Sequence, residues 1–367
     1  GRSVLMRIFI STGEASGDAY GAALVRHLRE SISRPTFEGT GTARMREEGV
    51  NLLADSSSWG AVSIAQALRV YPRIRRVYGK ICRALTHDPG LFIPVDFGYM
   101  NIRLARRAKA NGWRVLYFVP PGSWRRDRQG TDLPKVTDAI VTPFSWSAEM
   151  LVEMGANAHW FGHPIRQLLA ETGISLDQKR DAVAILPGSR RHEIEANLPV
   201  IAQAMADREV IAEFGLAPSV DRKWITEQWI RLSGRTGDKF TVGRAYDVLA
   251  RAQAAIVCSG TATLEAVLCR CPMVVVYQLT QAMKFEAKLI RMKRPKYVAL
   301  PNILLDRMAI PELVDTELTV AALKQQLDEL LSNPRSQDAV FHEIEDILGP
   351  ADAITRTAEL AASILVD

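Results

Sequence analysis

Short apolar runs alternate with amphipathic stretches along the whole chain, and this alternation limits the possible folds more than any other feature. The runs at 115–119, 182–186 and 273–277 are apolar throughout, as strands are when helices cover both faces of their sheet. Further strand-like runs lie at 6–12, 91–97, 138–144, 240–243 and 254–260. The pattern predicts an α/β protein with parallel sheets and helices on both faces.

A polar helical stretch at 163–181 has no strand pattern and divides the chain into two similar α/β halves. A chain of 367 residues is too long for one ordinary core and fits two domains. We predict a Rossmann-like domain over 1–165, a second over 166–345, and a C-terminal helix over 346–367 that packs on the first domain or on a partner subunit. Two such domains would face each other across a cleft, with ligands beyond the carboxyl ends of the strands.

The composition, 47% hydrophobic and 24% charged residues, is typical of soluble globular proteins. No 18-residue apolar run and no secretory signal pattern is present, so neither a transmembrane helix nor secretion is expected. The four cysteines form no C-x-x-C pair or disulfide framework, and Cys258 is expected to be a small buried hydrophobe. A reducing cytoplasm is the expected compartment. The six scattered histidines predict no metal site.

Positive charge is concentrated in two segments, 68–80 and 284–296, where basic residues are interleaved with apolar ones. Such segments suit the surface of an anionic membrane, where apolar neighbours add burial. The alternative is an amphipathic helix whose charged face is merely solvated. Nucleic acid is not an expected partner, because no recognised binding module accompanies the charge.

Two small-residue loops follow strands in the second half of the chain and open helical patterns. Their polar residues are Ser189, Arg190, Arg191 and Glu193 in the first loop, and Ser259, Gly260, Thr261 and Glu265 in the second. Unpaired N–H groups at a helix N-terminus suit a pyrophosphate, which Arg190 can neutralise with a forked contact. Glu265 can accept hydrogen bonds from ribose hydroxyls. Together the loops predict a nucleoside diphosphate site, although each alone also fits ordinary helix capping.

A glycine-rich turn follows the first strand, where Gly13, Gly17 and Gly21 recur every four residues. The turn is not G-x-G-x-x-G and lacks a Walker Lys-Ser/Thr, so it fits neither a dinucleotide nor the phosphates of ATP. Its glycines permit close backbone approach, and its polar residues can reach the hydroxyls of a sugar. These polar residues are Glu14, Ser16 and Asp18. A turn with an Asp or Ser cap is the alternative.

Asp96 follows a fully apolar strand, at a position where an acid is unusual for packing. Desolvation there would raise the pKa of a carboxylate and suit it to general base catalysis. A helix cap or a salt bridge to one of the many arginines is the alternative. His163 lies between Gly162 and Pro164 and either lines the same site or is a satisfied turn residue.

Taken together, these motifs resemble the lipid-A-disaccharide synthases, which are inverting glycosyltransferases of the GT-B fold. The matching segments follow the family's order over almost the whole chain. They are "GEASGDAYGA", "FEGTGTARM", the strand ending in Asp96 with "NIRLA", "FGHP", "LPGSRRHEIE", "SGTATLE", "PMVVVYQ" and "LPNILLDRMAIPEL". The resemblance is carried most specifically by "GEASGD" and by the pairing of "PGSR" with "SGTATLE".

The resemblance implies transfer of a diacylated glucosamine from UDP to the 6-hydroxyl of a lipid-linked glucosamine 1-phosphate, giving a β-1,6 disaccharide without metal or cofactor. It places the lipid acceptor and the "GEASGD" turn in the N-terminal domain and the UDP-sugar in the C-terminal one. Asp96 aligns with the family's proposed general base and Arg190 with its essential arginine, while Asn302 and Glu312 align with positions near the nucleotide. It also implies a peripheral location at the inner face of the cytoplasmic membrane, and a homodimer.

Departures from the family pattern fall mostly in the N-terminal half. The loop at 120–128 keeps Trp124, which we predict to lie on the acceptor side of the site. Other positions of the family motifs are changed. The changed positions are Gln66, Tyr99, Arg126, Ser145 and Gln278, and "PELVD" lacks the usual Gln. This pattern fits a divergent branch that uses a UDP-sugar with a different lipid acceptor.

Two further functions stay open at this stage. A UDP-N-acetylglucosamine epimerase shares the two-domain fold but would need a more acidic and histidine-rich site. A protein that binds UDP without transferring a sugar is permitted by the changed N-terminal motifs, although retention of Asp96 and Arg190 argues against it.

Overall fold

The computed structural model describes residues 6–13, 15–56, 59, 64–122, 132–279 and 295–366. The chain divides into two units: unit 1 comprises Gly1–Leu168 with Leu348–Asp367, and unit 2 comprises Leu169–Ile347. Each unit is built around its own parallel sheet, as the alternating pattern predicts, and each is described by itself below.

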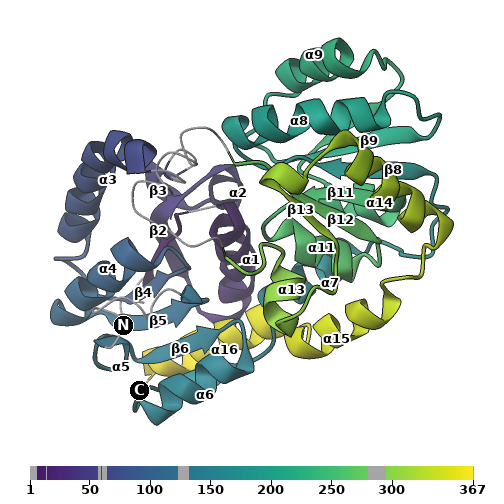
Figure 1. The fold of residues 1–367 in the computed structure, drawn as a ribbon. Coiled ribbons are helices and arrows are strands. Elements are labelled where there is room, and N and C mark those ends of the chain that lie inside the picture. The colour runs from purple at the N-terminus through teal and green to yellow at the C-terminus, as the bar shows by residue number, and fades with distance from the viewer. Residues whose placement is uncertain are drawn as a thin grey trace. The chain divides into compact units, whose positions relative to one another are not determined.

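Unit 1 contains a sheet in which seven described strands have the order β3-β2-β1-β4-β5-β6-β7 (Figure 1). The strands are β1 (Met6–Ser11), β2 (Pro35–Gly41), β3 (Asn51–Asp55), β4 (Leu91–Pro94), β5 (Arg114–Phe118), β6 (Ala139–Thr142) and β7 (Ala158–Trp160). The helices are α1 (Ala15–Ser31), α2 (Ala43–Glu47), α3 (Ile64–Ala84), α4 (Gly98–Ala110), α5 (Leu133–Val136), α6 (Ser145–Glu153), α7 (Pro164–Thr172), which continues into unit 2, and α16 (Ala353–Val366).

The C-terminal helix α16 packs against α1 and β5 within unit 1. Gln167, near the crossing to unit 2, holds the start of this helix: its Oε1 accepts hydrogen bonds from the N–H groups of Ile354 (2.7 Å) and Thr355 (3.1 Å). These contacts satisfy two of the donors that a helix N-terminus leaves unpaired. Whether the same helix also contacts a partner subunit stays a prediction.

Helix α3 contains the whole basic segment 68–80 that the sequence suggests for a membrane surface. Of its apolar residues, Val77 is buried and Ile74 and Tyr78 pack against the core of unit 1. Tyr71 is 58% exposed, so among the described side chains it is the large apolar group that faces solvent on this helix. In the part of the helix whose side chains the structure describes, the apolar face therefore packs mainly on its own unit. The second basic segment, 284–296, lies outside the described residues except for its last two positions.

Unit 2 contains a sheet in which six described strands have the order β10-β9-β8-β11-β12-β13. The strands are β8 (Ala182–Leu186), β9 (Ile211–Leu216), β10 (Lys239–Val242), β11 (Ala252–Cys258), β12 (Met273–Tyr277) and β13 (Glu312–Val314). The helices are α8 (Arg191–Met205), α9 (Arg222–Ser233), α10 (Ala245–Ala250), α11 (Ala262–Leu268), α13 (Leu300–Leu305), the 3-10 helix η3 (Asp315–Glu317), α14 (Val320–Ser332) and α15 (Asp338–Leu348).

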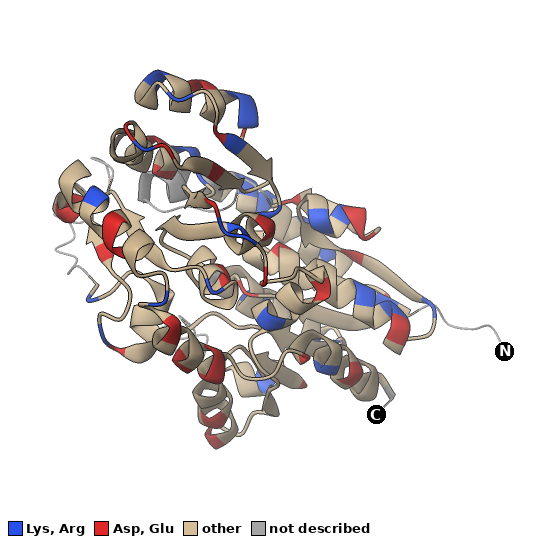
Figure 2. Ribbon diagram, turned by 90° about the vertical axis from the view of Figure 1, so that its right-hand side faces the viewer, with Lys and Arg blue, Asp and Glu red and all other residues tan. Residues whose placement is uncertain are grey.

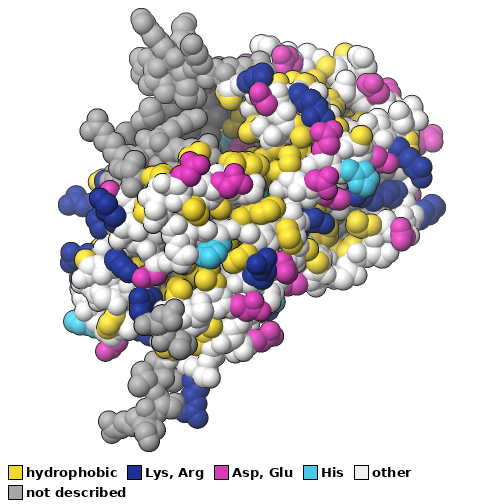
Figure 3. All heavy atoms as spheres, turned by 90° about the horizontal axis from the view of Figure 1, so that it is seen from below, with side chains coloured by type: hydrophobic (Ala, Val, Ile, Leu, Met, Phe, Trp, Pro, Cys, Tyr) yellow, Lys and Arg dark blue, Asp and Glu magenta, His cyan; other side chains and the backbone are white. Residues whose placement is uncertain are grey.

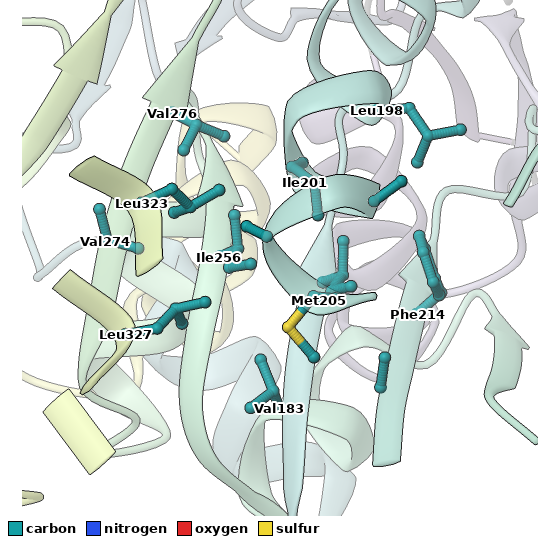
Figure 4. Packing of buried hydrophobic residues seen from close by; sticks show 14 of the residues in the cluster. Val183, Leu198, Ile201, Met205, Phe214, Ile256, Val274, Val276, Leu323 and Leu327 are labelled. Atoms are coloured by element: carbon teal, nitrogen blue, oxygen red, sulfur yellow. The ribbon is translucent and has the colours of Figure 1, made fainter. Parts of the chain in front are cut away.

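The core of unit 2 lies between its sheet and helices α8, α9 and α14 (Figure 4). Leu198, Ile201 and Met205 recur at helical spacing along α8 and are buried against the strands. Leu323 and Leu327 do the same from α14. Because these helices and strands are packed together, the loops at the carboxyl edge of the sheet are held on a rigid base.

The four cysteines are free, and Cys258, Cys269 and Cys271 are buried. Burial raises the pKa of the Cys258 thiol to about 12, so this thiol stays protonated. The prediction that Cys258 is a small buried hydrophobe is confirmed.

None of the helices in the described part of the chain combines the length and hydropathy needed to span a bilayer. In the view of Figure 2, Lys and Arg are interspersed with Asp and Glu along the ribbon. Apolar side chains are likewise interspersed with charged ones on the face shown in Figure 3.

Candidate functional site

The order of strands places a switch point between β1 and β4 in unit 1. The chain runs outward from β1 to β2 and β3 and then returns to β4 on the other side of β1, so the loops after β1 and β4 are neighbours. Ser11 and Pro94 are paired at this edge, and the Val95 N–H donates to the Ser11 carbonyl at 2.9 Å. Ligands of open α/β sheets bind at such points. The glycine-rich turn and Asp96 therefore meet where a ligand is expected.

Asp96 and the next residue, Phe97, both have left-handed backbone conformations, with φ of 50° and 47°. The left-handed region costs a non-glycine residue about 1–2 kcal/mol, so surrounding contacts must hold this segment. The Asp96 N–H donates to the Phe118 carbonyl at 3.2 Å. The Asp96 carbonyl accepts hydrogen bonds from the Tyr117 hydroxyl and from Asn101 Nδ2, each at 2.9 Å.

Asn101 is fully buried on α4 and joins the two neighbouring loops. Its Nδ2 also donates to the carbonyls of Ser11 and Val95, both at 3.1 Å. Its Oδ1 accepts a hydrogen bond from Ser11 Oγ at 2.7 Å. The orientation of the amide is therefore fixed from both ends.

The glycine-rich turn approaches this segment closely. A Cβ placed on Gly13 would clash with Cγ of Phe97, so the Phe97 ring occupies the space that a side chain at position 13 would need. A Cβ on Gly17 would lie 3.7 Å from Cβ of Asp96, which places the first turn of α1 beside Asp96. The positive end of a helix favours a negative charge there.

Asp18 and His163, two candidates for the acceptor side, are buried and already hydrogen-bonded. The carboxylate of Asp18 accepts hydrogen bonds from the N–H (2.5 Å) and the hydroxyl of Thr42, and burial raises the pKa of Asp18. His163 Nδ1 accepts from the Ile165 N–H at 3.2 Å, and burial lowers the pKa of His163 to about 3, so the ring is neutral near pH 7.

Asp18 therefore joins α1 to the start of α2, and His163 holds its own turn. Ser16 is half-buried in the first turn of α1, while Glu14 and Trp124 lie outside the described residues. A contact between any of these residues and an acceptor stays a prediction.

In unit 2 the switch point lies between β8 and β11, and the two predicted nucleotide loops follow these strands. Gly188 and Gly260 have φ of 110° and 137°, conformations that L side chains rarely adopt. A Cβ on Gly188 would lie 3.0 Å from Glu193 Oε2 and 3.5 Å from the Cys258 sulfur. The first loop therefore lies directly against the end of β11.

Arg190 precedes the 15-residue helix α8, and its Nη1 lies 3.4 Å from Glu193 Oε1. The side chain is 30% exposed, so the guanidinium is held at the loop but is reachable from solvent. Arg191 points elsewhere: its guanidinium lies 4.5 Å from the ring of Trp224 and pairs with Glu195 at 2.9 Å. A role for Arg191 in nucleotide binding stays a prediction.

Asn302 and Glu312 form a hydrogen-bonded pair that shapes the segment next to the second loop. Asn302 is fully buried, and its Nδ2 donates to Glu312 Oε1 at 2.8 Å. Glu312 also accepts from the N–H groups of Val298 and Ala299. Ser259 Oγ donates to the Val298 carbonyl at 2.6 Å. These side chains connect the loop after β11 to residues 298–312 through backbone contacts.

In the first loop, the Ser189 carbonyl accepts a hydrogen bond from the Ser219 hydroxyl. The remaining residues of the second loop lie at the start of α11. Thr261 and Glu265 are half-buried, and the Thr261 carbonyl accepts the Glu265 N–H at 3.2 Å. Contacts of these side chains with a nucleotide stay predictions.

Sequence reasoning missed Asn197, which connects the end of β12 to α8. This buried residue donates to the Glu193 carbonyl at 2.9 Å and accepts from the Gln278 N–H at 2.9 Å. Gln278, noted only as a departure, donates to Asp315 Oδ1 at 2.8 Å. Asn197 lies one helical turn after Glu193, and this spacing is the signal that relates it to the site.

The described residues contain no group of three or more His, Cys, Asp or Glu side chains arranged to hold a metal ion. The arrangement offers a carboxylate at the switch point of unit 1 and an arginine with glycine loops at that of unit 2. These groups suit proton removal and the binding of a pyrophosphate, respectively.

Comparisons with known proteins point to one family over nearly the whole length of the chain. The family model for lipid-A-disaccharide synthetase matches residues 8–363. The lipid-A-disaccharide synthase of Myxococcus xanthus is 32% identical over 381 residues, which cover 98% of this chain and 97% of that protein. The synthase of Neisseria meningitidis serogroup C is 31% identical, with 98% of this chain and 97% of that protein covered.

Solved structures similar to this chain share its fold at low sequence identity. MurG of Acinetobacter baumannii has a TM-score of 0.57 and 13% identity, with 98% of this chain and 99% of that chain covered. The UDP-GlcNAc 2-epimerase of Methanocaldococcus jannaschii has a TM-score of 0.60 and 12% identity, with 99% of each chain covered. The predicted fold class, GT-B type with two Rossmann-like sheets, is confirmed.

Proposed function

This chain belongs to the lipid-A-disaccharide synthase family, and we propose that it transfers a diacylated glucosamine from UDP to the 6-hydroxyl of a lipid-linked glucosamine 1-phosphate. It is a glycosyltransferase of lipid A biosynthesis with a GT-B fold. The observation that carries the residue assignments is the position of Asp96 and Arg190, each at the switch point of its sheet.

Asp96 acts as the general base in the proposed mechanism. Its carboxylate removes the proton from the acceptor 6-hydroxyl while that oxygen attacks the anomeric carbon of the donor. The new C–O bond forms as the bond between the anomeric carbon and the UDP oxygen breaks, and UDP leaves with the electron pair. The attack from the face opposite UDP gives the β-1,6 linkage. The position of Asp96 at the switch point of its sheet, beside the first turn of α1, supports this role.

The C-terminal unit binds the nucleotide in this proposal. Arg190 pairs with the pyrophosphate and stabilises the negative charge that UDP gains as it leaves. Gly188 and Gly260 let the backbone approach the phosphates, and their positive φ values support this assignment. Asn302 and Glu312 act indirectly, because their polar atoms hold the backbone at 298–310 next to the second loop.

The test of the proposed function is acceptor-dependent UDP release. Purified protein is incubated with UDP-2,3-diacylglucosamine, with and without 2,3-diacylglucosamine 1-phosphate, and the lipid product is analysed by mass spectrometry and NMR. We expect UDP release only when both lipids are present, together with a β-1,6 disaccharide. UDP binding without product would contradict the proposed acceptor and direct the assay to other lipid-linked sugars, as the altered N-terminal motifs suggest.

We also propose that the protein works at the inner face of the cytoplasmic membrane and touches the bilayer through α3. Arg75, Arg76 and Lys80 are exposed on this helix, and Tyr71 beside them is 58% exposed. Tyr71, Arg75 and Arg76 line a shallow hollow of about 380 Å³. Because Ile74, Val77 and Ile81 of α3 pack in the core of unit 1, attachment through the described side chains of this helix would be mainly electrostatic.

Charge reversal on α3 tests this attachment. The triple variant Arg75→Glu, Arg76→Glu, Lys80→Glu is expected to lower partitioning onto vesicles of anionic phospholipid roughly a hundredfold, since each basic residue contributes about 1 kcal/mol. Co-sedimentation with anionic and with neutral vesicles measures the effect. The matched control reverses Arg222, Lys223 and Lys239, which line a separate groove of unit 2. Equal losses in the two triple variants, or equal binding to neutral vesicles, would contradict docking through α3.

A further inference from the structure

The backbone around Asp96 is held by side chains that lie behind the site. Both sides of the residue are fixed: the Phe118 carbonyl accepts from its N–H, and its own carbonyl accepts from Tyr117 and Asn101. We propose that Tyr117 and Asn101 are positioning residues, which hold the Asp96 backbone in its left-handed conformation and so aim the carboxylate. This inference rests on the proposed role of Asp96 as the base.

The direction of the Asp96 side chain depends on this conformation. A residue released from positive φ relaxes to an ordinary β or right-handed helical conformation, and this rotation carries its Cβ to a new direction. Phe97 follows with positive φ as well, so two successive strained residues must be held together. Tyr117 and Asn101 both donate to the Asp96 carbonyl, which belongs to the peptide group between Asp96 and Phe97. Hydrogen bonds to this group oppose the relaxation of both residues directly.

Neither of the two donors loses its proton near neutral pH. Burial raises the pKa of Tyr117 well above its usual value, and the charge of Asp96 adds a smaller increase, so the hydroxyl stays protonated. The amide of Asn101 does not titrate, and the hydrogen bond from Ser11 Oγ to its Oδ1 prevents the amide from turning over. Neither group is placed to exchange protons with a substrate, since both are buried.

The sharpest test is Tyr117→Phe, which removes one hydroxyl and leaves the packing of the ring unchanged. We expect kcat to fall about three- to tenfold while KM for the donor and Kd for UDP stay at their wild-type values. Asn101→Ala removes three hydrogen bonds to carbonyls and is expected to lower kcat by more than about tenfold. Kinetics are normalised to the folded fraction of each variant, measured by thermal unfolding.

A matched control separates positioning from stability. Gln337 is also a buried amide with bonds to the backbone, accepting from the Met273 N–H (2.9 Å) and donating to the Met273 carbonyl (2.8 Å). Met273 begins β12, so Gln337 lies at the amino end of the sheet of unit 2, opposite the nucleotide loops. We expect Gln337→Ala to lower the melting temperature without changing kcat per folded molecule. Unchanged kcat in Tyr117→Phe, or parallel changes in kcat and KM, would overturn the inference.

A double variant distinguishes this inference from the proposed function. If the tyrosine acts through Asp96, Asp96→Asn combined with Tyr117→Phe is no slower than Asp96→Asn alone. Additive losses in the double variant would show that Tyr117 does not act through Asp96. Retention of wild-type kcat by Asp96→Asn would instead overturn the assignment of Asp96 as the base, and the positioning inference would fall with it.

Discussion

Asp96→Asn is expected to lower kcat for sugar transfer by about 10²–10⁴-fold, with the affinity for UDP unchanged. This range is the contribution that a positioned general base typically makes. Asparagine cannot take the proton of the acceptor hydroxyl, but it has nearly the size and shape of aspartate. The loss should appear in kcat, because the proton moves only as the transition state forms. Steady-state kinetics with both lipids and calorimetric titration of UDP measure the two quantities.

The choice of asparagine matters because the backbone at position 96 has φ of 50°. Asp and Asn tolerate this left-handed region better than other non-glycine residues, so the substitution does not force the loop to move. Asp88→Asn is the matched control, since Asp88 has φ of 46° and lies before β4, whereas Asp96 follows the same strand. We expect Asp88→Asn to retain full kcat. A similar loss in both variants would attribute the effect at Asp96 to the fold, and full activity of Asp96→Asn would exclude it as the base.

The fold could be predicted because its determinants are local. Fully apolar runs such as 115–119 and 182–186 require cover on both faces, and a parallel sheet with helices on both faces provides it. The positions of Asp96 and Arg190 near the carboxyl ends of strands also follow from sequence, since Asp96 comes directly after an apolar run and Arg190 comes four residues after the end of another. The order of strands then brings each of them to a switch point.

The contacts that hold these residues could not be predicted, because they depend on the register of distant strands. Asn101 and Ser11 are 90 positions apart and meet only when β1 and β4 pair. Tyr117 lies in a run that the sequence shows only as apolar, and nothing local reveals that its hydroxyl meets the Asp96 carbonyl. In the same way, nothing local reveals that Asp18, a polar residue of the glycine-rich motif, joins α1 to the start of α2 through Thr42.

Helix α3 shows a different limit of sequence reasoning. An amphipathic segment with apolar and basic faces has the same pattern whether its apolar face meets a membrane or the core of its own domain. Only the tertiary structure shows that Val77 and Ile81 are buried in the core of unit 1. Among the described side chains of this helix, exposed cations and Tyr71 are left to meet a membrane, and this is why the proposed attachment is mainly electrostatic.

Arg190→Ala is expected to weaken the binding of UDP about ten- to a hundredfold, because a charge-assisted contact to the pyrophosphate is lost. The loss also leaves Glu193, 3.4 Å from the arginine in the free protein, without the partner that neutralises it near the phosphates. Arg190→Lys should restore only part of the affinity, since lysine keeps the charge but not the forked geometry. Calorimetric titration of UDP and of uridine separates the pyrophosphate contribution, because uridine binding should stay unchanged.

Arg244→Ala is the matched control for this result. Arg244 also precedes a helix, α10, and pairs with the acid three residues on, Asp247, but it follows the edge strand β10 rather than a strand at the switch point. Its loss should leave UDP affinity within about twofold, because an exposed pair contributes little. Equal weakening by the two variants would indicate a general effect of positive charge on the unit. Unchanged UDP affinity in Arg190→Ala would remove this arginine from the pyrophosphate site and leave Arg191 as the candidate to test.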